Sequence, residues 1–222
     1  MILRDLGSTN GSFCNDRPVA ETALADGDSV RCGHVTLKFF AGYPVEYDRL
    51  QLLADVALRD PVTDLFDQDT LRLHLERSLA RCRDLREPLA LLLIGLDRLK
   101  GINDELGRRA GDAVLAWFAQ RLRDSVRRAD LTARYGGDEC GVILAHLNLG
   151  DAGVVAERIR GDIEAHPFEF EHTRIPVTIS IGVAERAERT EDAASLIARG
   201  HTVLRQAKQQ GRNLVWLAPD PG

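Results

Sequence analysis

Two adjacent carboxylates follow two adjacent glycines within the segment TARYGGDECGVIL, residues 132–144. The flanking residues are those of a pair of apolar strands, so Gly136, Gly137, Asp138 and Glu139 are predicted to form a hairpin tip. Because glycine reaches positive φ at no steric cost, a tight turn alone could account for them. A glycine tip would also let phosphate groups approach the backbone, and carboxylates are ligands that Mg²⁺ prefers. Both a simple turn and a site for metal and phosphate are consistent with this segment.

The composition of the 222-residue chain is that of a globular protein with a small negative charge. Lys and Arg number 29 against 34 Asp and Glu, which argues against DNA as a partner because nucleic-acid-binding proteins usually present a basic face. The longest apolar run covers only residues 89–96, whereas a membrane span needs roughly 20 residues. Four scattered cysteines without metal-ligand spacing indicate free thiols in a reducing compartment. We therefore expect a cytoplasmic protein with no DNA or membrane partner.

The chain divides into two unequal parts joined by a helix. Residues 1–41 contain short apolar runs between turn signals, which indicates an all-β fragment. This is too short for a β-sandwich of about 100 residues, so the fragment is expected to be a truncated domain. Residues 42–60 form a predicted linker helix, whose apolar stripe could either pair with its copy in a dimer or dock on its own domain. The larger domain is expected over residues 61–217.

The pattern of this larger domain predicts an α+β fold. Helices are expected over residues 63–84, 110–127, 151–165 and 192–209, and strands over residues 89–96, 175–184 and 213–218, with the 132–144 hairpin between them. A short helix is also expected around INDELG, residues 102–107. The order β-α-β-β-α-β after an N-terminal helix suits a central, mainly antiparallel sheet with helices packed on one face.

Five motifs in order make residues 60–217 resemble the GGDEF family of diguanylate cyclases, whose fold is similar to polymerase palms and class III nucleotide cyclases. The motifs are DPVTDLFDQDTL (60–71), LDRLKGINDELGRRAGDAVL (96–115), RRADLTARYGGDECGVIL (127–144), VTISIGVA (177–184) and LRQAKQQGRNLV (204–215). The resemblance implies that the protein joins two GTP molecules into cyclic di-GMP with release of pyrophosphate. It also implies a homodimer in which each domain holds one GTP, and Mg²⁺ or Mn²⁺ as cofactor.

The resemblance assigns roles to individual residues of the larger domain. Asp138 and Glu139 stand at the catalytic and metal-ligand positions, and Leu96 stands at a further metal position. The implied substrate positions are the guanine-reading pair Asn103 and Asp112 and a phosphate-side group of Lys100, Arg134, Gly136, Gly137, Lys208 and Arg212. Residue types alone leave other interpretations open: Asn103 could cap a helix, Asp112 could complement a helix dipole, and the cations could be solvated. Lys208 and Arg212 would share one helical face if their helix continues so far.

Two further stretches match binding sites of known families. Arg127 and Asp130 have the offset from Gly136 of the GGDEF family's inhibitory site, where cyclic di-GMP binds; alone, they would be a weak surface ion pair. Residues 1–41 resemble the second half of a forkhead-associated (FHA) domain, which reads phosphothreonine, with Asn10 at a peptide-contact position. The phosphate-holding residues of that family come earlier than Met1. A phosphothreonine partner is therefore expected only if the full FHA domain exists, and Asn10 is otherwise a turn residue.

Gly95 breaks the GGDEF pattern at the end of the first strand. The family has Asp-x-Asp there, with the first Asp a metal ligand, and this chain has Gly95-Leu96-Asp97. Asp97 lies roughly 6–7 Å farther along an extended strand, so it is not expected to replace the missing ligand. Gly95 could also be required for a positive φ. We expect cyclic di-GMP signalling with impaired catalysis; the alternatives are a catalytically inactive module that senses GTP or cyclic di-GMP, and a scaffold held by the linker helix. Milder departures are Leu99, Arg108 and Cys140.

Overall fold

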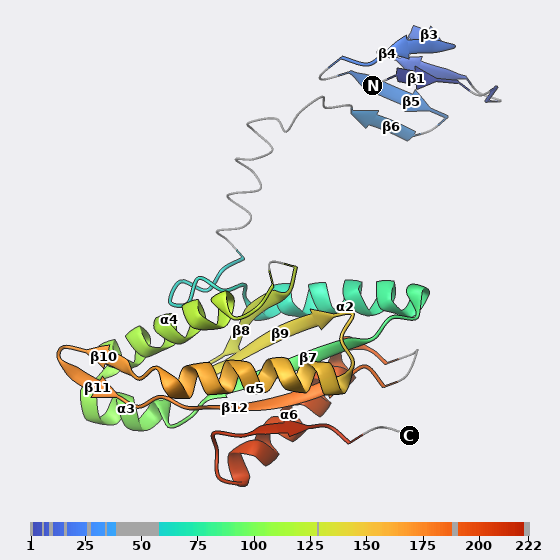
Figure 1. Cartoon of the computed structure of the whole chain (residues 1–222). Coiled ribbons are helices and arrows are strands. Elements are labelled where there is room, and N and C mark those ends of the chain that lie inside the picture. The colour runs from blue at the N-terminus through green and yellow to red at the C-terminus, as the bar shows by residue number, and fades with distance from the viewer. Residues whose placement is uncertain are drawn as a thin grey trace. The chain divides into compact units, whose positions relative to one another are not determined.

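The structure is a computed structural model that describes residues 2–5, 7–8, 11–15, 17–25, 28–33, 35–38, 58–127, 129–187 and 191–219. It divides into two compact units, Met1–Ala57 and Leu58–Gly222, which we describe separately (Figure 1). Asn10 and most of the helix predicted over residues 42–60 lie outside the described residues. The last three residues of that helix are described and are not helical, because Arg59 forms an isolated β-bridge with Phe66. The prediction therefore extends the helix too far.

The described part of the N-terminal unit consists of short strands and turns. The strands are β1 (Ile2–Arg4), β2 (Ser12–Cys14), β3 (Arg17–Val19), β4 (Glu21–Ala23), β5 (Ser29–Cys32) and β6 (Val35–Lys38). Strand β1 pairs with β4, and the other strands form an antiparallel sheet in the order β3-β2-β5-β6. Among residues of this unit whose burial is described, only Ser12 and Val30 are buried. The described residues of this unit therefore agree with the all-β fragment predicted over residues 1–41.

A five-stranded sheet forms the centre of the C-terminal unit, in the order β13-β12-β7-β9-β8. Its strands are β7 (Leu89–Leu96), β8 (Leu131–Gly136), β9 (Glu139–Ala145), β12 (Ile179–Glu185) and β13 (Val215–Leu217). Every neighbouring pair is antiparallel except β12 and β13, which are parallel. A separate hairpin is formed by β10 (Phe168–Phe170) and β11 (Thr173–Ile175). The prediction of a central, mainly antiparallel sheet is confirmed.

The helices of the C-terminal unit are α2 (Gln68–Leu85), α3 (Leu99–Leu106), α4 (Arg108–Asp124), α5 (Leu149–Ala165) and α6 (Ala193–Gln209). Helix α2 begins later than the predicted residue 63, because Asp64 has a φ of 54° and the side chain of Asp67 caps the helix by accepting from the Thr70 amide. None of the described helices is long and apolar enough to cross a membrane. The cysteines are free thiols, as predicted, and burial raises the pKa of the Cys140 thiol to about 12.

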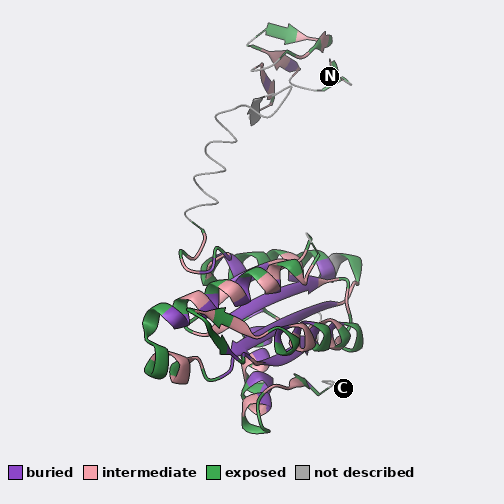
Figure 2. Cartoon of the chain, turned by 60° about the vertical axis from the view of Figure 1, so that its left-hand side comes forward, coloured by how far each residue is buried: buried purple, intermediate pink, exposed green. Residues whose placement is uncertain are grey.

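Helices cover both faces of the sheet, so the prediction of helices on one face is wrong (Figure 1). One face packs on α4 and α5 through an apolar cluster that includes Leu92 and Phe118, and the other packs on α2 and α6 through a cluster that includes Leu91 and Leu204. All eight residues of β7 are buried, as the purple central strands of Figure 2 illustrate. Because side chains alternate between the two faces of a strand, an uninterrupted apolar strand needs cover on both faces.

Close packing of α6 on β12 sets the position of the side chains at the C-terminal end of α6. At Gly182, a Cβ atom would lie 2.6 Å from the carbonyl oxygen of Gly200 and closer still to the backbone nitrogen of Leu204. Glycine at position 182 therefore lets the helix and strand backbones approach more closely than a side chain would permit. This packing brings the last turn of α6, with Lys208, beside Gly95 of β7.

Candidate active site

The two glycines form the hairpin tip because its backbone requires them. Gly136 has a φ of 152° and Gly137 a φ of 55°, values that L-residues with side chains rarely adopt. Strand β8 ends at Gly136 and β9 begins at Glu139, as predicted. The tip adjoins the end of β7, since Gly95 is the register partner of Glu139 and the Leu96 amide donates to the Asp138 carbonyl oxygen at 3.0 Å. The turn interpretation is thus correct, and the carboxylates lie where β7 ends.

A pocket of about 440 Å³ lies beside the hairpin. Its walls come from the end of β7, from α3 and α4, from the hairpin tip and from the end of α6. Among the residues predicted for the site, those that line it are Leu96, Lys100, Asn103, Asp112, Arg134, Gly137, Asp138, Lys208 and Arg212. Gly136 and Glu139 are chain neighbours of lining residues but do not line it themselves. Lys208 and Arg212 do not share a helical face, because α6 ends at Gln209 and Arg212 has a φ of 63°.

Asn103 and Asp112 lie in this pocket, and neither has the structural role that its residue type suggested. Asn103 lies inside α3 and does not cap it, and Asp112 lies beyond the first turn of α4. The side-chain oxygen of Asn103 is buried without a hydrogen-bond partner among the described residues. It fits closely against Gly111, where a Cβ atom would collide with it. A buried acceptor without a partner is costly, so this oxygen is suited to accept from a ligand donor.

Lys208 pairs with both carboxylates of the hairpin. Its Nζ atom lies 3.4 Å from Oδ2 of Asp138 and 3.1 Å from Oε1 of Glu139. Burial alone would lower the pKa of Lys208, but the two carboxylates outweigh burial and raise it. His201, one of the site residues that sequence analysis missed, lies 3.2 Å from the second oxygen of Glu139 and packs edge-on against Tyr135. The seven-residue spacing between His201 and Lys208 could have identified it, because that spacing places both side chains near one face of a helix.

The residues of this cluster do not fit a divalent cation. Position 95 supplies no carboxylate, and Leu96 can offer only its main-chain carbonyl. In the described part of the chain, no three His, Cys, Asp or Glu side chains group in a way that could hold a metal ion. Asp97 is not a displaced ligand either, because it is buried and accepts from the hydroxyls of Thr178 and Ser180. The set that remains is two carboxylates, already paired with an ammonium group.

The side chain of Arg134 links the hairpin tip to Asp60. Its Nη1 donates to both carboxylate oxygens of Asp60 at 3.0 Å, and its Nη2 donates to the Gly137 carbonyl oxygen at 2.8 Å. Burial alone would raise the pKa of Asp60, but hydrogen bonds from Thr63 and the charge of Arg134 lower it overall. Arg134 therefore lines the pocket as a positioning residue, with its guanidinium engaged by protein groups.

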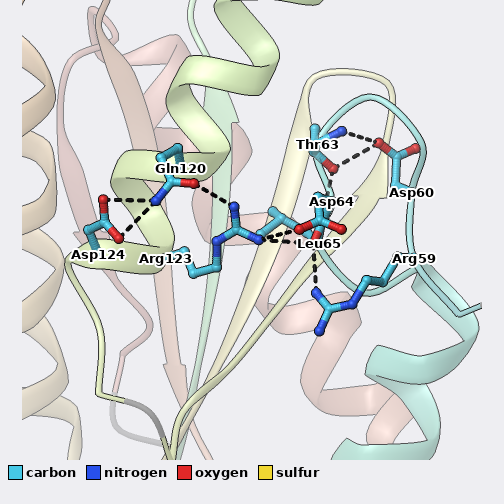
Figure 3. Close-up of polar contacts among 8 residues, drawn as sticks. All are labelled: Arg59, Asp60, Thr63, Asp64, Leu65, Gln120, Arg123 and Asp124. Atoms are coloured by element: carbon cyan, nitrogen blue, oxygen red, sulfur yellow. Dashed lines mark hydrogen bonds and ion pairs between the residues drawn. The ribbon is translucent and has the colours of Figure 1, made fainter. Parts of the chain in front are cut away.

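The turn that begins at Asp60 is held by α4 as well (Figure 3). Arg59 and Arg123 both donate to the carbonyl oxygen of Asp64, and Arg123 also pairs with the Asp64 carboxylate at 2.7 Å. Gln120 accepts from Arg123 and so orients it. These contacts stabilise the positive φ of Asp64, which only a minority of residues with side chains adopt. Helix α4, which carries Asp112, therefore also holds the turn that precedes α2.

Arg127 and Asp130 lie at a second pocket, of about 480 Å³. Asp130 accepts from the backbone amide of Arg127 at 2.9 Å, which closes a turn after α4. Arg158 of α5 also lines this pocket, and its Nη2 donates to the Ser125 carbonyl oxygen at 2.8 Å. Sequence analysis missed Arg158, since nothing in its local pattern relates it to a segment 28 residues earlier. The pocket combines two arginines with three aspartates, Asp124, Asp130 and Asp162. Arginines suit phosphates, and a carboxylate suits a guanine edge.

Comparison with known proteins matches both units of the chain. The profile of "Diguanylate cyclase, GGDEF domain" matches residues 57–214, and that of the FHA domain matches residues 1–33. The response regulator PleD of Caulobacter vibrioides is 39% identical over 163 residues, which cover 72% of this chain and 36% of PleD. The diguanylate cyclase TpbB of Pseudomonas aeruginosa is 37% identical over 161 residues, or 72% of this chain and 37% of TpbB. The chain thus spans little more than a third of the length of these relatives.

Solved structures agree with this assignment. One is the structure of the coiled coil and GGDEF domain of DgcB from Caulobacter crescentus in complex with c-di-GMP. Its TM-score is 0.72 at 26% identity, and the match covers 77% of this chain and 91% of the DgcB chain. The diguanylate cyclase SiaD of Pseudomonas aeruginosa, in complex with its activator SiaC, has a TM-score of 0.73 at 29% identity, covering 78% and 66%. With the glycine hairpin, the pocket and the family match over residues 57–214, these findings show that the chain belongs to the GGDEF family of diguanylate cyclases.

Proposed function

We propose that this chain is a cyclic di-GMP signalling protein whose GGDEF domain binds GTP but converts it to cyclic di-GMP poorly. The observation that carries the proposal is Gly95. It lies at the end of β7 as the register partner of Glu139, so the position nearest the hairpin carboxylates on this strand offers no third carboxylate. The pocket beside it retains the groups that would recognise a nucleotide.

Binding of GTP is supported by the arrangement of α3 and α4. Guanine presents two neighbouring donors, its ring N1–H and its exocyclic amine. The unpartnered oxygen of Asn103 and the carboxylate of Asp112 are acceptors that line one pocket and suit this edge. Lys100 and Arg212 line the same pocket and supply positive charge for phosphate oxygens.

Impaired catalysis follows from the charge that the reaction develops. A 3′-hydroxyl of one GTP must attack the α-phosphate of the other across a homodimer, and pyrophosphate must leave, so negative charge grows on phosphate oxygens. The family's chemistry uses a divalent cation, Mg²⁺ or Mn²⁺, for which the resemblance assigns Asp138, Glu139 and Leu96. Because this set lacks the third carboxylate and is paired with Lys208, we expect slow turnover at best.

A module that senses nucleotides without turnover is the second candidate. The pocket with Arg127, Asp130 and Arg158 favours it, because these residues do not depend on the hairpin carboxylates and could bind cyclic di-GMP made elsewhere. In this organisation residues 1–41 would be an FHA fragment, 42–60 a linker and 61–217 the nucleotide-binding domain of a cytoplasmic protein. A phosphothreonine partner would require a full FHA domain.

Two measurements test the proposal. Purified protein incubated with GTP and either Mg²⁺ or Mn²⁺ should yield little or no cyclic di-GMP by liquid chromatography. Calorimetry with a non-hydrolysable GTP analogue should nevertheless detect binding, which Asn103→Ala abolishes and Asp104→Ala, an exposed neighbour on α3, leaves unchanged. Rapid product formation would refute impaired catalysis, and equal analogue affinity in both variants would refute the assigned guanine site.

A further inference from the structure

We propose that Lys208 is the resident cation of this site: its ammonium group occupies the space that Gly95 leaves open and keeps divalent cations off Asp138 and Glu139. The pocket would then hold a nucleoside triphosphate without a metal ion. This inference rests on the proposed function only for the identity of the nucleotide. Its statement about metal exclusion concerns the protein alone and can be tested without GTP.

The first observation is that Lys208 and a side chain at position 95 compete for the same space. A Cβ atom built on Gly95 would lie 2.5 Å from Nζ of Lys208 and closer still to its Cε atom, whereas the next nearest atom, Cδ1 of Leu204, is 3.7 Å away. Real Cβ atoms do not approach other heavy atoms so closely, so even alanine at position 95 would displace the end of Lys208. Among the nearest atoms, only those of Lys208 would collide with a side chain at this position.

The second observation is that Gly95 is not required by the backbone. It lies within the ladder of β7, paired with Ser180 on one side and Glu139 on the other, and its φ is not positive. This removes the interpretation of Gly95 as a residue that supplies an unusual φ. What the glycine provides is room, and Lys208 uses that room to reach both carboxylates.

The third observation is that the ammonium group of Lys208 is already paired with both hairpin carboxylates. Lys208 contacts Asp138 and Glu139 at once, and the three side chains are 25–40% exposed. A divalent cation would therefore have to displace a positive charge that is already in place, and its own charge would be repelled by that ammonium. An ammonium has three donors, and these two contacts leave one for a phosphate oxygen in the pocket that Lys208 lines.

The direct test is a titration of the full chain with Mn²⁺ in the absence of nucleotide, followed by electron paramagnetic resonance or calorimetry. Wild type should bind Mn²⁺ weakly. Lys208→Met should bind it at least about tenfold more tightly, because the substitution removes an ammonium group that would repel the ion at close range in a partly exposed site. Asp138→Asn added to Lys208→Met should abolish the gain, which assigns the bound ion to this pair.

Two controls make the result decisive. Arg205→Met removes a positive charge from an exposed position on the same helix, α6, outside the pocket, and it should leave Mn²⁺ affinity unchanged. Lys208→Gln removes the charge but keeps a polar, unbranched side chain, and it serves if the methionine variant melts early. Equal Mn²⁺ affinity in wild type and both Lys208 variants, or an equal gain in Arg205→Met, would overturn the proposal.

A separate measurement extends the inference to the nucleotide. Affinity for a GTP analogue should differ less than about twofold between Mg²⁺ and EDTA in wild type, since the proposed resident cation is part of the protein. A tenfold loss in EDTA would overturn the inference. Absence of analogue binding under both conditions would instead refute the proposed function and leave the Mn²⁺ result to stand by itself.

Discussion

Replacing Gly95 by aspartate should raise the affinity of the site for Mn²⁺ about thirtyfold and should raise the rate of cyclic di-GMP formation from GTP. Position 95 has strand geometry, so aspartate introduces no backbone strain. The only close obstacle to its Cβ atom is the end of Lys208, a flexible side chain that can move aside. Because position 95 pairs with Glu139 in the sheet, the new carboxylate would lie near Asp138 and Glu139 and complete a group of three.

The magnitude follows from the distances and exposure of the existing cluster. Opposite unit charges near 4 Å interact by about 1 kcal/mol in water and about 4 kcal/mol at the effective dielectric of a protein surface. The carboxylates here are 25–40% exposed, so an intermediate value of about 2 kcal/mol applies, which corresponds to a factor of about thirty. Gly95→Asn is the matched control, because it has the same shape without the charge: it should gain only the smaller part of the Mn²⁺ affinity that displacement of Lys208 releases, and it should gain no turnover.

The assay combines calorimetric titration with Mn²⁺ and chromatographic measurement of cyclic di-GMP at fixed protein concentration. Circular dichroism melts of the wild type and both variants check that the fold is retained. Robust turnover by the wild type that Gly95→Asp leaves unchanged would falsify the reasoning, because the site would then work without the third carboxylate. A gain of similar size in Gly95→Asn would show that steric displacement of Lys208, and not the added charge, is responsible.

Three other predictions concern product binding and stability. Arg127→Ala should abolish calorimetric binding of cyclic di-GMP while Arg77→Ala, an exposed arginine of α2, should not; equal affinities would exclude the second pocket as the binding site. Asp60 has a lowered pKa, so its contribution to stability is present above its unfolded value of 3.8 and is lost as pH falls through the lower folded value. Thermal melts should therefore fall more steeply on acidification in wild type than in Asp60→Asn, and parallel curves would contradict this. Gly182→Ala should destabilise the domain by about 1–3 kcal/mol in urea unfolding, because its Cβ would meet the backbone of α6. Gly161→Ala, with open space around it on α5, should be neutral or stabilising by up to about 1 kcal/mol, and similar losses in both would refute the packing argument.

Local patterns in the sequence were sufficient for the elements and for the family. The helix over 192–209 corresponds to α6, and the glycine pair forms the turn with positive φ that its residue types allow. Such features depend on periodicity and on backbone preferences, which neighbouring residues encode. The prediction that helices pack on only one face of the sheet was wrong, although the uninterrupted apolar run of β7 indicates a strand that is covered on both faces. The start of α2 was misplaced because the turn held by Arg59 and Arg123 depends on partners distant in sequence.

The site required the tertiary structure wherever side chains meet across elements. The sequence by itself determined that position 95 lacks the carboxylate usual in the family, but it could not say what occupies the space. Lys208 is 70 residues from Asp138, and their contact depends on how closely α6 packs on β12 at Gly182. The same holds for His201 beside Glu139 and for Arg158 at the second pocket. Spacing along a chain carries information about one helix or one hairpin. Contacts between elements are decided by the packing of their faces, and here that packing puts an ammonium group beside Gly95.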